Sequence, residues 1–558
     1  MIRRRNPARA DGLPATLHPV LRRVYAGRGI QSAEELETGL DRLLPPTLAG
    51  LEAACELLGS SLMARERIVI CGDYDADGAT STALAVSTLR ELGGDVDFCV
   101  PDRFRMGYGL SPELAEQAAA TGARTLVTVD CGIASHAGVR AAKVLAMRVI
   151  ITDHHLPGPD LPDADAIVNP NCGGDPFPSK HLAGVGVMFY LLTALRVHLR
   201  GKGWFDRRPE PRLSTGLDLV ALGTVADLVR LDTNNRLLVG QGLRRIRAGQ
   251  ARPGIQALLQ VAGRVPERVY ASDLGFSVGP RLNAAGRLTD MRLGIQCLLA
   301  PDMASAQALA TKLEQLNLER RDLQAKMEVS ASDLAVDNVS VGVSLFDPGW
   351  HEGVVGLVAS RMKEKLHRPV IAFARAQQAG MLKGSARSIP GLHIRDALVA
   401  VDAGSPGLIN RFGGHAMAAG LSLAESRLEE FRTIFDQVCR AAVPASALER
   451  HIETDGELNE EEFSLETAQV LEQGGPWGQG FPEPLFDGLF SIESARVVGD
   501  VHVKYRLRTG GGQGVSAIHF RGLGAMRSSG QARFVYRPVI SRWRGEELEM
   551  QVQELLPA

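Results

Sequence analysis

The chain has 558 residues, which corresponds to three or four domains at roughly 100–200 residues per domain. Its hydrophobic fraction of 45% and its charged fraction of 23% are typical of globular proteins, so wholesale disorder is excluded. The 62 basic and 64 acidic residues leave a net charge of −2, so a nucleic-acid partner would have to be bound by a local basic surface.

The cysteines and the N-terminus indicate the compartment. Seven cysteines are scattered without a CxxC pair, which is unlike a secreted disulfide framework or a structural zinc site and favours a reducing environment. The N-terminus is basic but has no apolar signal region, and no segment reaches ~18 uninterrupted apolar residues. We expect a soluble cytoplasmic protein with no membrane association.

Residues 1–66 predict a helical lead-in, because segments 18–29, 33–46 and 51–63 place apolar residues at helical spacing. A parallel-sheet domain is predicted next, over 67–300, since short β-branched runs alternate there with helical segments. The predicted strands are 67–71, 95–100, 125–130 and 148–153.

The second half predicts two further domains. A long amphipathic helix at 303–336, within a connecting segment 301–338, leads to a second α/β domain at 339–445. This second domain has predicted strands at 341–346 and 370–374 and a predicted helix at 354–366.

Residues 446–558 divide by charge. Ten acidic residues and no Lys or Arg occur in 451–490, which favours either a partner surface or a solvated linker. Residues 491–558 alternate like β-strands and predict a small barrel. Its aromatic residues lie among arginines, so they are either ordinary core residues or part of a surface that binds single strands. These residues are Tyr505, Phe520, Phe534, Tyr536 and Trp543.

The sharpest motif is CGDYDADG, directly after the first predicted strand of the parallel sheet. Residues two apart in an extended chain point the same way, so Asp73, Asp75 and Asp77 could crowd their carboxylates at one point. A solvated turn is the plain alternative. An EF-hand loop is excluded, because its twelfth position is Leu84 where a bidentate Glu is required.

Three further polar sites follow predicted strands or an apolar run: Asp130, then Asp153-His154-His155, then Asp227. The carboxyl ends of parallel strands meet at one edge of a sheet, so we expect these side chains to converge. An Asp-rich set without thiolate ligands suits Mg²⁺ or Mn²⁺, and a shared carboxylate could hold two such ions ~3.5–4 Å apart for phosphoryl chemistry.

The motifs DYDADG, VDCG, TDHH and GTVAD, in this order, resemble those of the DHH phosphoesterase superfamily. The resemblance implies a two-metal hydrolase in which His155 contacts the scissile phosphate beside Asp130 and His154. Related pyrophosphatases place a histidine ligand where this chain has Cys71, and we expect Cys71 not to bind metal. The implied metal ligands are Asp75, Asp77, Asp130, His154 and Asp227.

Segments 350–361 and 411–420 resemble the DHH-associated domain, whose Gly-Gly-His loop presents backbone N–H groups and an imidazole to phosphate. On the residues alone, this Gly-Gly is also an ordinary turn before a helical segment. Segments 279–287 and 383–388 and the lead-in resemble long bacterial members of the superfamily that are single-strand-specific exonucleases. The implied substrate-binding residues are His351, Gly413, Gly414 and His415, with Arg103, Arg281, Ser385 and Arg387 on the 5′ end.

The resemblance implies a multidomain α/β enzyme with a C-terminal OB-like barrel that binds nucleic acid. Its expected activity is metal-dependent 5′→3′ hydrolysis of single-stranded DNA to mononucleotides, in recombination and repair, with two Mn²⁺ or Mg²⁺ ions. A monomer is expected to act with a single-strand-binding protein and a separate helicase, since the chain lacks a G-x-x-x-x-G-K-[ST] motif. The alternatives are an oligoribonuclease or small phosphodiesterase of the same superfamily, and a non-catalytic strand-binding scaffold.

Overall fold

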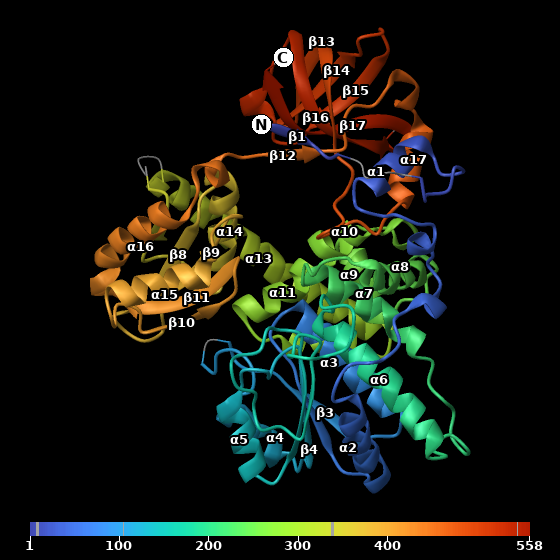
Figure 1. The fold of residues 1–558 in the computed structure, drawn as a ribbon, viewed down its shortest axis with the longest axis vertical. Helices are drawn as coiled ribbons and strands as arrows, with labels where there is room; N and C mark the ends of the chain where they lie inside the picture. Colours follow the sequence, from blue (N-terminus) through green and yellow to red (C-terminus); the bar gives the residue numbers. More distant parts are fainter. Residues whose placement is uncertain (7–10, 104, 336–339, 544, 558) are drawn as a thin grey trace.

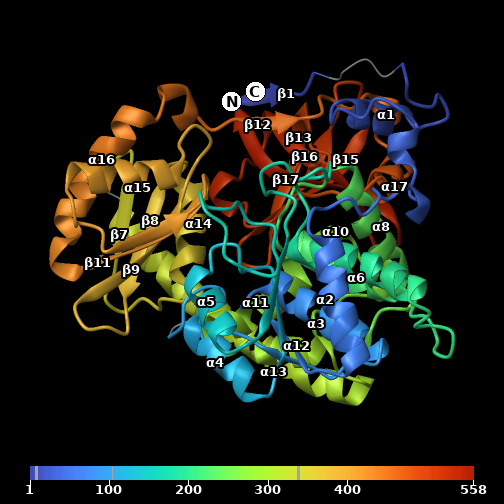
Figure 2. The same cartoon turned by 60° about the horizontal axis from the view of Figure 1, so that its bottom comes forward.

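The computed structural model describes residues 1–6, 11–103, 105–335, 340–543 and 545–557, and its chain forms two α/β domains and a barrel (Figure 1). The predicted boundaries at 338 and 339 and the predicted end at 558 lie outside these residues. No helix within them is long and apolar enough to cross a membrane. In both Figure 1 and Figure 2, the second α/β domain lies to the left of the first domain and the barrel.

The first α/β domain contains a five-stranded sheet in the order β3-β2-β4-β5-β6, and every pair of neighbouring strands is parallel. The predicted parallel sheet is therefore confirmed. The strands are β2 (Ile68–Cys71), β3 (Val96–Cys99), β4 (Thr125–Val129), β5 (Arg148–Thr152) and β6 (Ala166–Val168).

Alternate residues of these strands face different helix layers, as the pleat requires. Ile70 and Val127 pack in the larger core together with residues of α3 and α6, whereas Val69 and Leu126 pack with residues of α4 and α5. The four helices are α3 (Ala76–Glu91), α4 (Pro112–Ala120), α5 (His136–Val144) and α6 (Gly184–Gly201).

A group of helices extends this domain toward the barrel and toward the second domain (Figure 1). They include a short π-helical turn, η5 (Leu274–Val278), which directly follows α10. The helices are α7 (Leu217–Ala226), α8 (Thr233–Arg247), α9 (Pro253–Val261), α10 (Ala271–Asp273), α11 (Gly279–Leu288) and α12 (Arg292–Leu298).

The lead-in is only partly helical. Helices α1 (Pro19–Ala26) and α2 (Leu51–Ala64) form as predicted. The prediction for 33–46 is wrong, because this segment holds two short 3₁₀ turns, Glu34–Leu36 and Leu40–Arg42. Extended backbone at Gly39 separates the two turns, and the prolines that end the segment cannot continue a helix.

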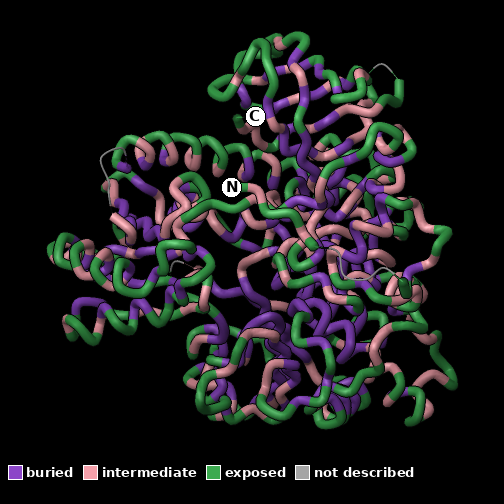
Figure 3. The backbone as a smooth tube through the Cα atoms, turned by 45° about the horizontal axis from the view of Figure 1, so that its top comes forward, coloured by how far each residue is buried: buried purple, intermediate pink, exposed green. Residues whose placement is uncertain are grey.

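Helix α13 (Met303–Ala335) connects the two α/β domains, as predicted, and much of its length is exposed or half-buried. Figure 3 shows buried backbone concentrated inside the domains and exposed backbone along their edges. The second domain has a mixed sheet in the order β10-β11-β9-β8-β7. Residues 418–424 form a strand rather than the helical segment that the plain alternative assumed. The elements are β7 (Val343–Phe346), α14 (Val355–Leu366), β8 (Val370–Arg375), β9 (Met381–Arg387), α15 (Ile394–Gly404), β10 (Arg411–Gly414), β11 (Ala418–Ala424) and α16 (Leu428–Ala442).

The C-terminal strands close into a barrel in the order β13-β14-β15-β17-β16, which confirms the predicted OB-like fold. Tyr505, Phe534 and Tyr536 are its core residues, whereas Phe520 and Trp543 are exposed. The barrel strands are β13 (Phe486–Val498), β14 (His502–Arg508), β15 (Gly514–His519), β16 (Gly530–Ser541) and β17 (Glu547–Pro557).

The acidic segment 451–490 is not a solvated linker. It contains β12 (Ile452–Thr454), which pairs in parallel with the N-terminal strand β1 (Ile2–Arg4), and it contains α17 (Leu465–Gln473). Its carboxylates pair with arginines that are distant in sequence. Asp455 binds Arg28 at 2.8 Å with both side chains almost fully buried, and Asp487 binds Arg4 and Arg533 at 2.7 Å.

Candidate metal centre and phosphate-binding residues

The predicted metal-binding motifs lie where the strand order reverses. β2 is flanked by β3 on one side and by β4 on the other, so the loops after β2 and β4 diverge and leave a ligand position between them. The loop after β2 carries Asp73 and Asp75, Asp77 lies in the first turn of α3, and β4 leads directly into Asp130. Asp130 has a left-handed backbone with φ of 59°, a conformation that is uncommon outside glycine.

Helix ends fix these carboxylates. Asp75 caps α3, because its Oδ1 accepts hydrogen bonds from the backbone N–H groups of Asp77 at 2.9 Å and Gly78 at 3.0 Å. Asp77 in turn accepts a bond of 2.6 Å from the N–H of Gly184, at the start of α6. A Cβ at Gly184 would lie 2.6 Å from the Cβ of Asp130, so only glycine allows α6 to approach this closely.

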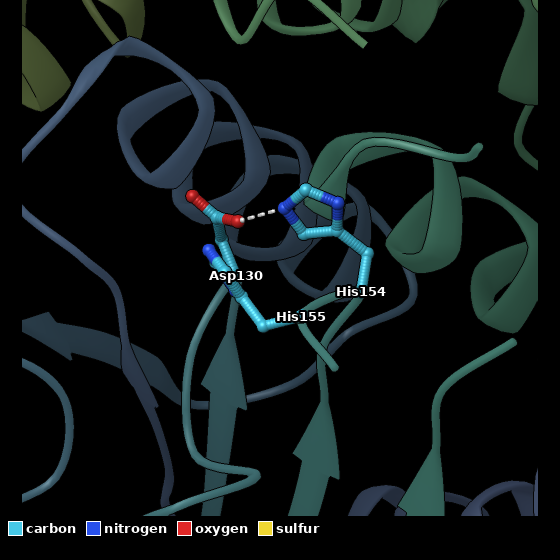
Figure 4. A group of neighbouring side chains, drawn as sticks. All are labelled: Asp130, His154 and His155. Carbon is cyan, nitrogen blue, oxygen red and sulfur yellow. Dashed lines mark ion pairs between the residues drawn. The ribbon is translucent and has the colours of Figure 1, made fainter. Parts of the chain in front are cut away.

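His154 links the motifs after β4 and β5 to Asp227, which follows α7. Its Nε2 lies 3.1 Å from Oδ1 of Asp130 and 3.5 Å from Oδ2 of Asp227. Figure 4 shows the imidazole of His154 turned toward the Asp130 carboxylate. Three overlapping groups have ligand atoms within 4.8 Å of one another: Asp77, His154 and Asp227; Asp130, His154 and His155; and Asp73, Asp75 and Asp130.

The electrostatics of this cluster favour a bound cation. Burial and the neighbouring carboxylates raise the pKa of Asp77 to about 7 and that of Asp227 to about 8. The pKa of Asp130 is raised well above its usual range for the same two reasons. Burial, with a smaller contribution from His155, lowers the pKa of His154 and so favours the neutral imidazole that binds metals.

The cluster fits a divalent ion by its donor atoms. Within the described part of the chain, Oδ1 of Asp73 is buried without a hydrogen-bond partner, and Oδ1 of Asp130 and Nε2 of His154 are buried 3.1 Å apart without the geometry of a hydrogen bond. Buried polar atoms are normally paired, so these atoms are available as ligands. Carboxylate oxygens with one imidazole suit Mn²⁺ or Mg²⁺. All five predicted ligands meet here, and Asp73 joins them although it was not among the predicted ligands.

His155 is held by Asp153 of the same motif and by Tyr108, which the sequence did not single out. Its Nδ1 is 2.8 Å from Oδ1 of the buried Asp153 and 3.1 Å from the hydroxyl of Tyr108. Burial opposes protonation, but the hydrogen bond and charge of Asp153 outweigh it and raise the pKa of His155 to about 9. The His415 ring, from the second α/β domain, stacks on His155 with centroids 5.9 Å apart.

Three arginines converge where the two α/β domains meet, and we call Arg103, Arg287 and Arg387 the arginine cluster. Burial and repulsion from Arg103 and Arg387 lower the pKa of Arg287 to about 9. Nη1 of Arg387 donates to Oγ of Ser385 at 3.0 Å, and the first turn of α14 packs against these two side chains. Guanidinium groups gathered at a helix N-terminus form a positively charged site that is suited to phosphate.

Arg281 does not join the arginine cluster. Its Nε lies 2.5 Å from Oε2 of Glu314 on α13, and its Nη1 donates to the carbonyl oxygen of Ser277. Arg287, six residues further along the chain, occupies the position expected for Arg281 and was missed. The rest of this segment supports the loop after β2: the Asn283 side chain accepts from the N–H of Ala76, and a Cβ at Gly286 would collide with a backbone oxygen of that loop.

The remaining predicted residues lie on the second domain. Gly413 and Gly414 end β10, and Gly414 adopts φ of 142° while the N–H of His415 bonds to the carbonyl oxygen of Ala418. His351 precedes α14, and its Nδ1 accepts from the N–H of Gly353, the residue whose carbonyl oxygen binds Arg287. His415 and His351 are thus placed at the domain junction.

Cys71 lies apart from the metal-binding groups. It is fully buried in the small core between the sheet and helices α4 and α5, where its Sγ is 2.7 Å from that of Cys99. Burial, with smaller contributions from Cys99 and Cys131, raises the pKa of the Cys71 thiol well above its usual range. The Cys71 thiol therefore packs as a core residue.

Comparison with known proteins agrees with this arrangement. Residues 67–224 match the DHH family N-terminal domain, 338–441 the DHHA1 domain and 454–554 the RecJ OB domain. The single-stranded-DNA-specific exonuclease RecJ of Dickeya dadantii is 51% identical over 569 residues, which cover 99% of each chain. Two solved structures of RecJ from Thermus thermophilus cover the whole of this chain. The complex with Mn²⁺ has a TM-score of 0.83 at 31% identity over 79% of its chain, and the complex with Mg²⁺ has 0.77 at 29% over 78%.

The fold and the carboxylate–histidine cluster define a metal-dependent nuclease of the DHH class, with Mn²⁺ or Mg²⁺ as its cofactor. The domain order and the extent of the sequence identity make the assignment narrower. The chain belongs to the RecJ family of exonucleases.

Proposed function

We propose that this nuclease degrades single-stranded DNA from the 5′ end and releases mononucleotides, in DNA recombination and repair. The observation that carries the proposal is the adjacency of the metal-binding cluster to the arginine cluster, at the junction of the two α/β domains. The relatives named above, which are single-stranded-DNA-specific exonucleases, support the choice of substrate.

The metal ligands are proposed to be the five predicted residues, with Asp73 as a sixth. Two ions fit the overlap of the groups, because Asp130 belongs to two of them and His154 joins Asp130 to Asp227. Divalent ions held here would lower the pKa of an attacking water and neutralise charge that develops on the phosphate. Asp75 and Asp77, fixed by backbone N–H groups, keep their positions before and after metal binds.

His155 is proposed to contact the scissile phosphate. Asp153 orients its ring and favours its protonated form, so its Nε2 can donate to a phosphate oxygen. His415 on the opposite domain stacks on this ring and brings a second imidazole to the phosphate.

Polarity is proposed to arise from the arginine cluster. Its guanidinium groups repel one another, so a terminal 5′-phosphate bound among them would relieve this repulsion and fix the end of the strand. Ser385 and the first turn of α14 would add hydrogen bonds to the same phosphate. A strand anchored in this way places its first phosphodiester bond at the metal-binding cluster.

The other predicted functions have less support. The C-terminal barrel favours a long single strand over the short substrates of an oligoribonuclease or small phosphodiesterase. A non-catalytic scaffold would not need all five predicted metal ligands, which fall in overlapping groups of neighbouring ligand atoms here. We propose that a single-strand-binding protein and a separate helicase supply the substrate, and that the enzyme acts as a monomer in the cytoplasm.

The test is degradation of a single-stranded 30-mer, labelled at either end, with Mn²⁺ or Mg²⁺. Immediate release of a 5′-labelled mononucleotide and progressive shortening of the 3′-labelled strand are expected. The matching duplex and single-stranded RNA should stay intact. Release of 3′-labelled mononucleotide first, or preferential cleavage of RNA or of oligomers of two to five nucleotides, would refute the proposal.

A further inference from the structure

The ring of Phe276 is exposed on an otherwise buried turn. Phe276 lies on η5 with 80% of its surface exposed, whereas Leu274 and Val278 on the same turn are fully buried. The turn therefore holds the aromatic ring out toward solvent on a fixed backbone. A single exposed apolar residue is common on protein surfaces, so the position of this ring relative to the metal-binding cluster and the barrel decides what it could bind.

This turn rests on the segment that presents a metal ligand. A Cβ at Gly275 would lie 3.2 Å from the Val225 side chain, and a Cβ at Gly279 would lie 3.2 Å from the Cβ of Ala226. Ala226 ends α7, and Asp227 follows directly. The backbone that carries Phe276 is thus packed against the residues that lead into the metal-binding cluster.

The same turn is tied to the barrel. Tyr270, at the start of α10, hydrogen-bonds to Glu472, and Glu472 pairs with Arg542 in the β16–β17 loop at 2.8 Å. Trp543, next to Arg542, is 87% exposed. Figure 1 shows α10 on the side of the first α/β domain that is turned toward the barrel. A strand that passes from the barrel to Asp227 would therefore cross η5.

We infer that Phe276 stacks on one nucleobase of the DNA strand between the barrel and the metal centre. An aromatic ring accepts any base, because every base has a π face, and this suits an exonuclease that must pass all sequences. Phe276 would bind and position the strand without touching the reacting atoms. The inference rests on the proposed function, which supplies the strand.

Phe276→Ala tests the inference through binding. Base–aromatic stacking is worth about 1–3 kcal/mol per base, so KM for a single-stranded 30-mer should rise about 5- to 150-fold while kcat stays near the wild-type value. Phe276→Trp should restore KM, because it keeps an aromatic face. Val144→Ala, which truncates an exposed apolar residue on α5, should change neither constant.

Substrates with one abasic nucleotide, scanned from the 5′ end, identify the stacked base. In the wild type, an abasic nucleotide at one position should raise KM as much as Phe276→Ala does, and the variant should show no further loss at that position. An unchanged KM in Phe276→Ala would overturn the inference, and so would abasic effects that add fully to the effect of the variant. Hydrolysis of RNA or of short oligomers alone by the wild type would instead refute the proposed function together with this inference.

Discussion

The metal-binding cluster and the acidic segment 451–490 contain the same chemical group in opposite electrostatic settings. In the cluster, buried carboxylates face one another, and their pKa values are raised. In the acidic segment, carboxylates face arginines. Burial there would raise the pKa of Asp487, but its hydrogen bonds to Arg4 and Thr454 outweigh burial and lower it. Buried carboxylates that face one another are suited to a metal ion, whereas buried carboxylates that face arginines hold segments of the chain together.

The largest effect should follow from changing Asp130 in the cluster. Asn keeps the shape and tolerates the left-handed backbone at this position, so Asp130→Asn should fold normally. Loss of a shared ligand should lower kcat on the 30-mer by about 10³-fold or more, since metal chemistry supplies several kcal/mol. Glu461→Gln, an exposed carboxylate of the acidic segment, is the control. Wild-type turnover by Asp130→Asn would remove this residue from the site.

The acidic segment should show the reverse pattern, with a loss of stability and little change in chemistry. Arg28→Ala leaves Asp455 buried without its main partner, which should cost about 3–5 kcal/mol of unfolding free energy, measured by denaturant titration. The kcat of the folded fraction should be retained. Arg3→Ala, on the exposed face of β1, should leave stability within about 0.5 kcal/mol of wild type. Equal stability of the two variants would contradict the structural role of the pair.

Metal binding should stabilise the protein only through the cluster. Mn²⁺ at 100 times its Kd should add about 2.7 kcal/mol per site to the unfolding free energy, and differential scanning calorimetry should record a higher Tm. The rise should shrink in Asp130→Asn and persist in Glu461→Gln. If Mn²⁺ raised the Tm of all three proteins equally, the ion would be binding elsewhere.

The arginine cluster is the converse case, because its guanidinium groups lie near one another and form no ion pair with a carboxylate in the described part of the chain, so the cluster should take phosphate. Arg387→Ala should weaken binding of a 5′-phosphorylated single strand by about 1.5–3 kcal/mol, the worth of hydrogen bonds to a charged group. The slope of log Kd against log salt should fall by about 0.7, which corresponds to one lost phosphate contact. Arg361→Ala, an exposed arginine of α14 that pairs with Glu364, should leave both unchanged. An unaltered slope in Arg387→Ala would exclude it from the phosphate path.

Much of the metal centre was predictable because it depends on one rule of parallel sheets. Asp130 and His154 each follow a strand, and strands that run in parallel end at the same edge. Local patterns also gave barrel strands β14 to β17 their correct type, since alternation of apolar and polar residues is a property of neighbouring positions.

The sequence could not predict which side of a helix faces the domain junction. It also could not predict ion pairs between residues that are distant along the chain. Arg281 and Arg287 are six residues apart on α11, which places them about 240° apart around the helix, so only one can face the domain junction. Contact with Glu314 on another helix decides which one it is. The partners of Asp455 and Asp487 include Arg28 and Arg4, more than 400 residues away, so a run of acidic residues alone did not show that it was neutralised.

The position of bound Mn²⁺ tests the central claim most directly. Anomalous scattering from a crystal of the protein grown with Mn²⁺ locates each ion without assumptions about ligands. We predict two peaks among Asp75, Asp77, Asp130, His154 and Asp227, and none along residues 451–490. A single peak would contradict the two-ion proposal. Peaks at the acidic segment, or none at the cluster, would contradict the central claim. That claim is that carboxylates form a metal site where they face one another and not where they pair with arginines.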